Sequence, residues 1–535
     1  MEFKRLNSMI KDYYKLYKVV KKTYSNTSIL ESLGTMSKNS RYTIIGVISK
    51  EILFEENNIY YLKKESRNPE EVNWLDVIDG WVENLGKSNT PYQLGAIGYI
   101  GYDIKDYFEN IQKKLERDSD VPYIYMVKYK LLFVWDRTEE NGCWIYEDES
   151  LINEIKQIEG SYENYTLLKI SESFNLLGDL EPNFTKEQYI DSINKNIDYI
   201  KKGDIFQANI TMRFSGNYSG DVFVLYDELR KKTPNPYFAF FDFKYPFIST
   251  SPEAFFEIKD NKIISCPIKG TVRCVLDGKD QKENLENDIK NRAENVMIAD
   301  LIRNDIGRVC KIGSVNVDVL CGVKKFNNLY HMESIISGEL DENIAFSKVM
   351  QYNFPGGSIT GAPKVRSMEI IEELEYTERN VYCGLIGFLG CNGYVNTSIG
   401  IRIVYFDDKK LYFHAGGGIT IKSNAEDEYR ELMLKVELMR NTINSFNVLN
   451  EMRSKIDEID SNIIMYLDKR FGLIREISEI KKLYGISVMQ SDRVKNIINR
   501  ISTITIKENT NISSDFLKKL YLLIIEQAMN IEKEV

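Results

Sequence analysis

The sequence predicts an α+β protein that ends in an all-helical domain. Short strand-like runs separated by turn residues fill the part before about residue 180. Helix and strand patterns alternate from about residue 186, and after Phe446 only helical periodicity remains. The chain has 535 residues, which is more than one hydrophobic core usually supports, so we expect several domains or one large composite fold.

The first region, residues 1–180, is expected to be rich in β-sheet. Its strand signals are runs of apolar, β-branched and aromatic residues at 42–46, 95–102 and 126–135. The middle region, residues 186–440, carries mixed signals. It predicts a helix over 186–202, a strand over 208–214 and a long helix over 283–302.

The last region, residues 447–535, shows apolar residues spaced by three or four positions, as in an amphipathic helix. These residues are Ile456, Ile459, Ile463, Ile464, Leu467, Phe471, Ile474, Ile477 and Ile480. Such a helix of roughly 35 residues is longer than most globular helices and is expected to supercoil with a partner.

Composition excludes several classes of function. The formal net charge is -9, so the chain offers no basic surface for a phosphate backbone, and we expect no nucleic-acid partner. Seven cysteines occur without a C-x-x-C pair, which disfavours thiolate metal sites and a disulfide framework. Because no apolar run reaches the ~20 residues of a membrane span, we expect no membrane insertion and a cytoplasmic location.

Any metal site must rely on carboxylates, because the chain contains only two histidines. Mg²⁺ is then the expected ion. The candidate ligands are Glu294 and the pair Glu428 and Glu431, which are three residues apart and so share a helix face. Solvated charges on a helix surface are the alternative interpretation.

Two glycine clusters, at 355–364 and 415–419, are candidate anion sites. Consecutive glycines let backbone N–H groups approach a phosphate or carboxylate without an obstructing Cβ. Neither cluster contains the G-K-[ST] or G-x-G-x-x-G pattern of nucleotide sites, and a generic turn is the alternative.

An ordered series of motifs resembles the chorismate-utilising enzymes, the family of anthranilate, aminodeoxychorismate, isochorismate and salicylate synthases. The motifs lie at 203–207, 251–253, 267–271, 292–308, 354–366 and 415–431. Segments 28–32, 40–42 and 98–103 are similar to the N-terminal region of the anthranilate and aminodeoxychorismate branch. The resemblance implies a two-sheet fold like that of anthranilate synthase component I, with helices outside.

The same resemblance assigns roles to individual residues. It implies that Glu294 and Glu431, with Glu428 beside them, bind a Mg²⁺ ion that holds the ring carboxylate of chorismate. It makes Glu253 the general acid for loss of the C4 hydroxyl and places His331 against the ring. The remaining implied substrate contacts are Gln207, Thr271, Ser358, Tyr382, Arg402, Gly416, Gly417, Gly418 and Lys435.

Two positions choose among the branches of the family. Gln207 stands where the isochorismate and salicylate synthases carry a lysine base that activates water. Lys269 stands where anthranilate synthases carry alanine and where aminodeoxychorismate synthases carry lysine. The resemblance thus implies that Lys269 adds covalently at C2 and that ammonia then attacks C4, and Asn209 favours the same branch. An anthranilate-type enzyme that happens to carry this lysine is the alternative.

The ammonia is expected to come from a partner, a glutamine amidotransferase subunit (component II), because the chain lacks a G-x-C-x-G glutaminase turn. Free ammonium is the other possible source. Five residues match a pocket that binds tryptophan in relatives, as a feedback site or a structural ligand: Glu31, Ser32, Arg41, Pro236 and Tyr237.

Residues 447–535 resemble the small all-helical chorismate mutases. The resemblance implies a site made of Arg453, Arg470, Lys481, Arg493 and Glu532, within a homodimer in which Arg453 reaches the partner's site. Val494, Ala528 and Glu532 depart from the family's usual Glu, Ser and Gln. The domain is therefore expected to act on chorismate, to act on aminodeoxychorismate, or to serve only as a dimeriser or sensor.

Overall fold

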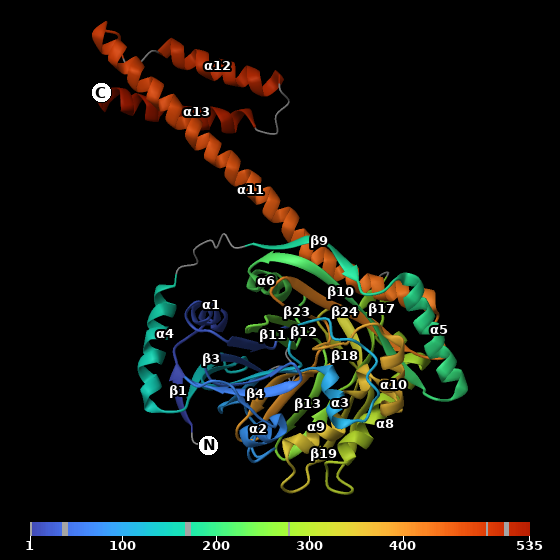
Figure 1. The fold of residues 1–535 in the computed structure, drawn as a ribbon. Coiled ribbons are helices and arrows are strands. Elements are labelled where there is room, and N and C mark those ends of the chain that lie inside the picture. Colours follow the sequence, from blue (N-terminus) through green and yellow to red (C-terminus); the bar gives the residue numbers. More distant parts are fainter. Residues whose placement is uncertain are drawn as a thin grey trace. The chain divides into compact units, whose positions relative to one another are not determined.

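The computed structural model describes residues 3–34, 41–165, 173–276, 279–487, 491–507 and 513–534. The chain divides into two compact units, Met1–Phe446 and Asn447–Val535. The first unit is built on a network of 22 hydrogen-bonded strands, supplemented by a small two-stranded hairpin (Figure 1).

The N-terminal part of the first unit contributes nine strands and six helical segments. They are β1 (Lys4–Ser8), α1 (Tyr13–Thr23), β2 (Thr27–Glu31), β3 (Tyr42–Glu56), β4 (Ile59–Lys64), β5 (Glu70–Glu71), α2 (Trp74–Trp81), β6 (Gly95–Ile100), η1 (Tyr102–Ile104), α3 (Lys105–Phe108), β7 (Ile124–Asp136), β8 (Asn141–Tyr146), η2 (Glu149–Leu151), α4 (Ile152–Asn164) and β9 (Phe174–Pro182).

The rest of the unit carries the segments in which the family motifs lie. Its elements are α5 (Lys186–Lys202), β10 (Gln207–Gly220), α6 (Val222–Lys232), β11 (Tyr237–Asp242), β12 (Phe247–Ser251), β13 (Ala254–Lys259), β14 (Lys262–Ser265), β15 (Ile268–Arg273), β16 (Val275–Leu276), β17 (Lys279–Asp280), α7 (Lys282–Glu286), α8 (Ile289–Gly307), β18 (Asn316–Phe326), β19 (Leu329–Glu339), α9 (Phe346–Asn353), η3 (Gly357–Ile359), β20 (Gly361–Ala362), α10 (Lys364–Leu374), β21 (Leu385–Gly390), β22 (Val395–Ile399), β23 (Ile403–Phe406) and β24 (Lys410–Ile419).

The regions 1–180 and 186–440 are joined by shared strand pairing. β2 pairs with β11, and β6 pairs with β21, both antiparallel. Two large hydrophobic cores pack against the strands, and each contains buried residues from both regions. The two regions therefore share one compact unit.

The long strand β10 organises the part of the fold that carries the site. It pairs with β24 over ten residues and also with β9 and β20. α5 precedes it with the bounds that the sequence predicts, because the Thr185 and Gln188 side chains cap its first turn and Gly203 ends it at a φ of 84°.

The single helix expected over 283–302 is wrong. The segment forms two helices, α7 and α8, separated at Asn287 and Asp288. Asp288 adopts an extended conformation, and its side chain accepts a hydrogen bond from the Asn291 N–H, so it starts a new helix instead of continuing the first.

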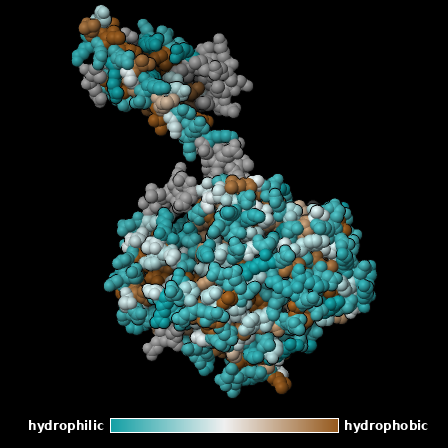
Figure 2. Space-filling model, viewed as in Figure 1, coloured by the Kyte–Doolittle hydropathy of each residue, from teal (hydrophilic) through white to brown (hydrophobic). Residues whose placement is uncertain are grey.

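The second unit contains the end of α11 (Ala425–Leu483), with α12 (Ser491–Lys507) and α13 (Ser514–Glu534). α11 spans 59 residues because it starts at Ala425, well before the predicted helical region. Apolar residues on these helices stay exposed in the single chain, among them Ile456, Ile459, Ile463, Ile464 and Ile480 (Figure 2). Within the described residues, no helix combines the length and the apolar character needed to cross a bilayer.

Candidate active site

Lys269 lies on β15, next to the loop that contains the first glycine cluster. Its Nζ donates a hydrogen bond to the Ser358 backbone carbonyl over 3.0 Å. Surrounding protein atoms lower the pKa of Lys269, while Glu253 and Glu294 oppose that shift. A lysine amine that loses its proton more easily than usual is a better nucleophile.

Glu253 lies between β12 and β13 and is only 5% exposed. Burial raises the pKa of its carboxyl, and the positive charge of Lys269 opposes the rise. The Ile268 N–H lies 3.5 Å from Glu253 Oε1, which links this carboxyl to the strand that carries the lysine. The pair therefore combines a carboxyl that favours its acid form with an amine that favours its base form.

His331 lies on β19, the antiparallel neighbour of β15. Its Nδ1 is 2.8 Å from the Thr271 hydroxyl, and the two residues are register partners. Burial, with the charge of Arg402, lowers the pKa of His331 to about 4. The imidazole is therefore neutral near pH 7 and acts there as a hydrogen-bonding group, not as a cation.

Arg402 interacts electrostatically with Glu253 and His331, whereas Tyr382 packs against His414. Arg402 is exposed, yet nearby protein atoms lower its pKa, with Glu253 opposing. The Tyr382 ring is 6% exposed and stacks on His414, with ring centroids 4.6 Å apart. The Tyr405 hydroxyl lies 2.9 Å from His414 Nε2, and this hydrogen bond fixes the orientation of the imidazole against Tyr382.

Several buried polar atoms near the glycine clusters have no hydrogen-bond partner among the described residues. They include both amide atoms of Gln207 and the side-chain oxygen of Asn209. A Cβ at Gly418 would lie 2.3 Å from Gln207 Nε2, so a larger residue there would displace this amide. Buried polar groups without partners are costly, and a polar ligand would satisfy them.

Glu294 on α8 and the two glutamates Glu428 and Glu431 at the start of α11 influence one another electrostatically. Burial and the neighbouring Glu428 raise the pKa of Glu294, and burial and the neighbouring Glu431 raise the pKa of Glu428. Lys435 Nζ lies 2.9 Å from Glu431 and donates to the Gly416 carbonyl over 2.8 Å. Carboxylates that raise one another's pKa are a favourable environment for a cation.

These oxygen ligands fit Mg²⁺. Among the described residues, no three His, Cys, Asp or Glu side chains lie close enough together to enclose a metal ion by themselves. Mg²⁺ commonly binds one or two carboxylates and completes its shell with water and substrate oxygens. A site of this kind has few protein ligands by nature.

The five residues of the tryptophan-like pocket line one cavity of about 170 Å³. Two of the charged residues that line it, Glu31 and Arg41, are already paired within the protein. Glu31 is 2% exposed and accepts hydrogen bonds from Arg230 and Tyr226, and Arg41 donates to Asp136 over 2.7 Å. Any amino or carboxylate group of a ligand must share these charges with their present partners.

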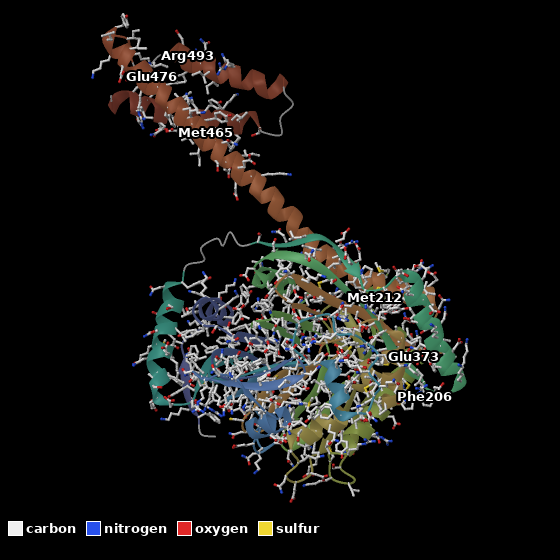
Figure 3. The ribbon with its side chains drawn as sticks, in the orientation of Figure 1. Phe206, Met212, Glu373, Met465, Glu476 and Arg493 are labelled. Atoms are coloured by element: carbon white, nitrogen blue, oxygen red, sulfur yellow. The ribbon has the colours of Figure 1, made fainter. Side chains whose placement is uncertain are left out.

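In the second unit, Lys481 forms an ion pair of 2.8 Å with Glu532. One guanidinium nitrogen of Arg470 is buried without a hydrogen-bond partner among the described residues. Arg493 is exposed on α12 (Figure 3). Arg453 belongs to α11, but its side chain lies outside the described residues.

Two buried residues, Arg379 and His414, were not predicted from the sequence. Arg379 is 1% exposed and pairs with Glu375 at 2.7 Å, and it also donates to the Asn209 and Ile359 carbonyls. Glu375 and Arg379 lie beyond the end of α10 at Leu374, so the i, i+4 spacing of helical ion pairs does not predict this contact. His414 gives no signal of its own, because its partners Tyr382 and Tyr405 lie on other strands and loops.

Comparison with known proteins agrees with this geometry. Residues 35–441 match the family described as chorismate binding enzyme, and residues 452–533 match chorismate mutase type II. The chain is 37% identical over 350 residues to aminodeoxychorismate synthase component 1 of Escherichia coli (strain K12), which covers 65% of this chain and 76% of that protein.

A relative with a different product is also similar. Anthranilate synthase component 1 of Lactococcus lactis is 31% identical over 437 residues, covering 77% of this chain and 93% of that protein. Among solved structures, anthranilate synthase component I from Streptococcus pneumoniae aligns with a TM-score of 0.66 at 29% identity, over 75% of this chain and 92% of that one. The α+β fold expected from the resemblance is thereby confirmed.

Proposed function

The chain belongs to the chorismate-binding enzyme family and carries a C-terminal chorismate mutase domain, and on this premise we propose that it aminates chorismate at C4 to give 4-amino-4-deoxychorismate. The observation that supports this proposal is the placement of Lys269. Its amine has a lowered pKa and lies beside a carboxyl with a raised pKa, Glu253.

The first step is a displacement by the lysine. The Lys269 lone pair forms a bond to C2, the C1=C2 electrons move to C1–C6, and the C5=C6 electrons move to C4–C5. The C4–O bond breaks, and Glu253 protonates the departing oxygen so that it leaves as water. Neutral His331, held by Thr271, offers a hydrogen-bonding surface without adding a positive charge near the lysine.

The second step reverses the electron flow with ammonia as nucleophile. A bond forms between nitrogen and C4, the two double bonds return to C5=C6 and C1=C2, and the C2–N bond to Lys269 breaks. The departing Lys269 amine regains its lone pair and leaves neutral, and the proton that the new C4 ammonium loses returns to the Glu253 carboxylate. Overall, chorismate and ammonia give 4-amino-4-deoxychorismate and water.

Mg²⁺ is the proposed cofactor, held by Glu294, Glu428 and Glu431. The ion supplies positive charge for the ring carboxylate of the substrate. Arg402 and Lys435 are the cations proposed to bind substrate carboxylates. Gln207 has unpaired amide atoms, and Gln207 and Ser358 are proposed to contact the substrate.

A separate glutamine amidotransferase is the proposed source of ammonia. The relatives that match the chain are named component 1, which supports a two-component arrangement. Free ammonium is expected to replace this partner in the test tube, since ammonia itself is the nucleophile.

Anthranilate formation is the alternative, and relatives of both kinds match the chain at more than 30% identity. The position of Lys269 favours amination at C4. An enzyme that delivers ammonia directly to C2 has no use for an amine of lowered pKa placed against the general acid.

The C-terminal domain is proposed to form a homodimer and to rearrange an enolpyruvyl ether. The exposed isoleucines of α11 are the surface proposed to pack against the second copy. Lys481 and Arg470 are the cations proposed to bind the substrate, and Glu532, paired with Lys481, must be protonated to donate a hydrogen bond to an ether oxygen.

Product analysis tests the central proposal. The full-length protein is incubated with chorismate, Mg²⁺ and ammonium chloride, and the products are separated and identified by mass and by the position of the amine. We expect 4-amino-4-deoxychorismate and, from the second domain, a rearranged product. Formation of anthranilate would instead support the alternative.

A further inference from the structure

The Ser358 carbonyl oxygen accepts hydrogen bonds from two side chains. Lys269 Nζ donates to it over 3.0 Å, and Asn209 Nδ2 donates to it over 3.2 Å. The acceptor Ser358 lies in η3. The donors Lys269 and Asn209 lie on β15 and β10, so they come from different strands. A carbonyl oxygen has two lone pairs, and both donors are therefore satisfied at once.

The backbone of Asn209 is held at both of its polar groups. The residue is 9% exposed, its N–H donates to the Thr360 carbonyl over 2.8 Å, and its carbonyl accepts from Arg379 over 2.8 Å. Arg379 also donates to the Ile359 carbonyl over 3.0 Å. The chain that follows Ser358 is thus tied to β10 and to a buried arginine, and the Asn209 side chain extends this anchoring to the Ser358 carbonyl itself.

This anchoring bears on the direction of the nucleophile. An amine nitrogen is tetrahedral, so a hydrogen bond from one N–H to a fixed oxygen restricts where its lone pair can point. Attack on a ring carbon needs a distance of about 3–3.5 Å and an aligned lone pair. A carbonyl that rotates would carry the amine out of that geometry.

We propose that Asn209 is a positioning residue, which holds the Ser358 carbonyl so that the Lys269 amine bound to the same oxygen faces the carbon it attacks. The inference rests on the proposed function, because it assigns Lys269 as the nucleophile. Asn209 itself does not touch the reacting atoms. Its effect is on the rate of adduct formation and not on substrate affinity.

The test compares three substitutions at this position in the full-length protein. Asn209→Leu and Asn209→Asp keep a similar size but remove the N–H donor, whereas Asn209→Gln keeps a donor on a longer side chain. Asn217→Leu, at the exposed end of the same strand, is the matched control. Each variant is assayed for kcat, for Mg²⁺-dependent chorismate binding and for its thermal unfolding midpoint.

Adduct formation is measured separately by omitting ammonium. Intact-protein mass spectrometry after rapid mixing follows the species whose mass exceeds that of the protein by chorismate less one water. We expect the Leu and Asp variants to lose about 100-fold in kcat and in the rate of adduct formation, since a misplacement of about 1 Å has an effect of that size. Chorismate binding should stay close to wild type, and the Gln variant should recover part of the rate.

Three results would overturn the inference. In the first, Asn209→Leu forms the adduct at the wild-type rate. In the second, kcat falls only in proportion to a loss of chorismate binding or thermal stability, as for a structural residue. In the third, the wild-type protein makes no C4 amine, and the inference then falls together with the proposed function. C4 amination that needs Lys269 but not Asn209 would refute the positioning role alone.

Discussion

Replacing Lys269 by alanine separates chemistry from binding. The substitution removes the proposed nucleophile but leaves Arg402, Lys435 and the carboxylate cluster in place. We expect kcat for C4 amination to fall by at least about 10³-fold, which corresponds to about 4 kcal/mol of transition-state stabilisation. The Ser358 carbonyl keeps its hydrogen bond from Asn209, so the free energy of unfolding should change by only about 1 kcal/mol.

The assay follows 4-amino-4-deoxychorismate by mass from chorismate, Mg²⁺ and ammonium chloride. Chorismate binding is measured in parallel and should change by less than about threefold, because Lys269→Ala leaves the remaining cations of the site intact. Lys262→Ala is the matched control, since Lys262 is an exposed lysine on the neighbouring strand β14.

Chemical rescue makes the test sharper. Lys269→Cys followed by 2-bromoethylamine rebuilds an amine at nearly the original position. All seven natural cysteines are buried, so alkylation should favour the introduced thiol. Recovery of amination is expected after alkylation. Wild-type product formation by Lys269→Ala, or by the unalkylated Cys variant, would refute the covalent role.

The pH profile of kcat should be bell-shaped, because Lys269 becomes active as it loses its proton and Glu253 becomes inactive as it loses its own. The apparent pKa for the lysine should lie below that of a free lysine, and the apparent pKa for the glutamate should lie above that of a free glutamate. A rate that keeps rising into alkaline solution would contradict the role of Glu253 as an acid. Glu294→Gln should abolish turnover while Glu426→Gln, on the exposed first turn of α11, should not, and full activity in excess EDTA would disprove the metal requirement. Light scattering should give a dimer that Ile463→Glu weakens, and a wild-type monomer at micromolar concentration would argue against the exposed α11 surface as an interface.

Local chemistry explains which elements the sequence alone predicts. The bounds of α5 could be predicted because the residues that start and stop it, Thr185 and Gly203, are adjacent to it in sequence. The break at Asp288 was missed because the apolar pattern continues across it, and a side chain that accepts from the backbone outweighs the pattern there. The early start of α11 was missed for the opposite reason, since its first turns are polar and carry several charged residues, among them Glu428 and Glu431.

Some residues of the candidate site could be proposed from the sequence, and others could not. Motif order alone named Glu253, Lys269 and His331 as candidates. The structure pairs the strands of Lys269 and His331, and the Ile268 N–H beside Lys269 lies 3.5 Å from the Glu253 carboxyl. The pairing of Glu31 with Arg230 joins residues 199 positions apart, and no local pattern indicates it. Contacts of this kind depend on the topology of the whole sheet, and a single sequence does not reveal which distant strands meet.

The last prediction concerns the substrate of the C-terminal domain. Two activities that both consume chorismate would compete, whereas a mutase that accepts 4-amino-4-deoxychorismate would act on the product of the first domain. Val494, on α12, motivates the proposal that the domain acts on the amino compound. The mutases that this domain resembles carry a Glu at this position, which is expected to contact the C4 hydroxyl. Valine offers no such contact. The enolpyruvyl ether and both carboxylates are common to the two molecules, so the contacts proposed for Arg470 and Lys481 are the same for either one.

Full-length Lys269→Ala permits the comparison, since its first domain should neither aminate chorismate nor consume the amino compound. The variant is given chorismate and 4-amino-4-deoxychorismate in separate reactions, and the rearranged products are measured by mass and absorbance. We expect a higher kcat/KM for the amino compound, and Val494→Glu should shift the preference toward chorismate. Equal or better turnover of chorismate by the Val494 enzyme would reject the sequential route. No turnover of either compound would mean that the helical domain serves the synthase only as a dimeriser.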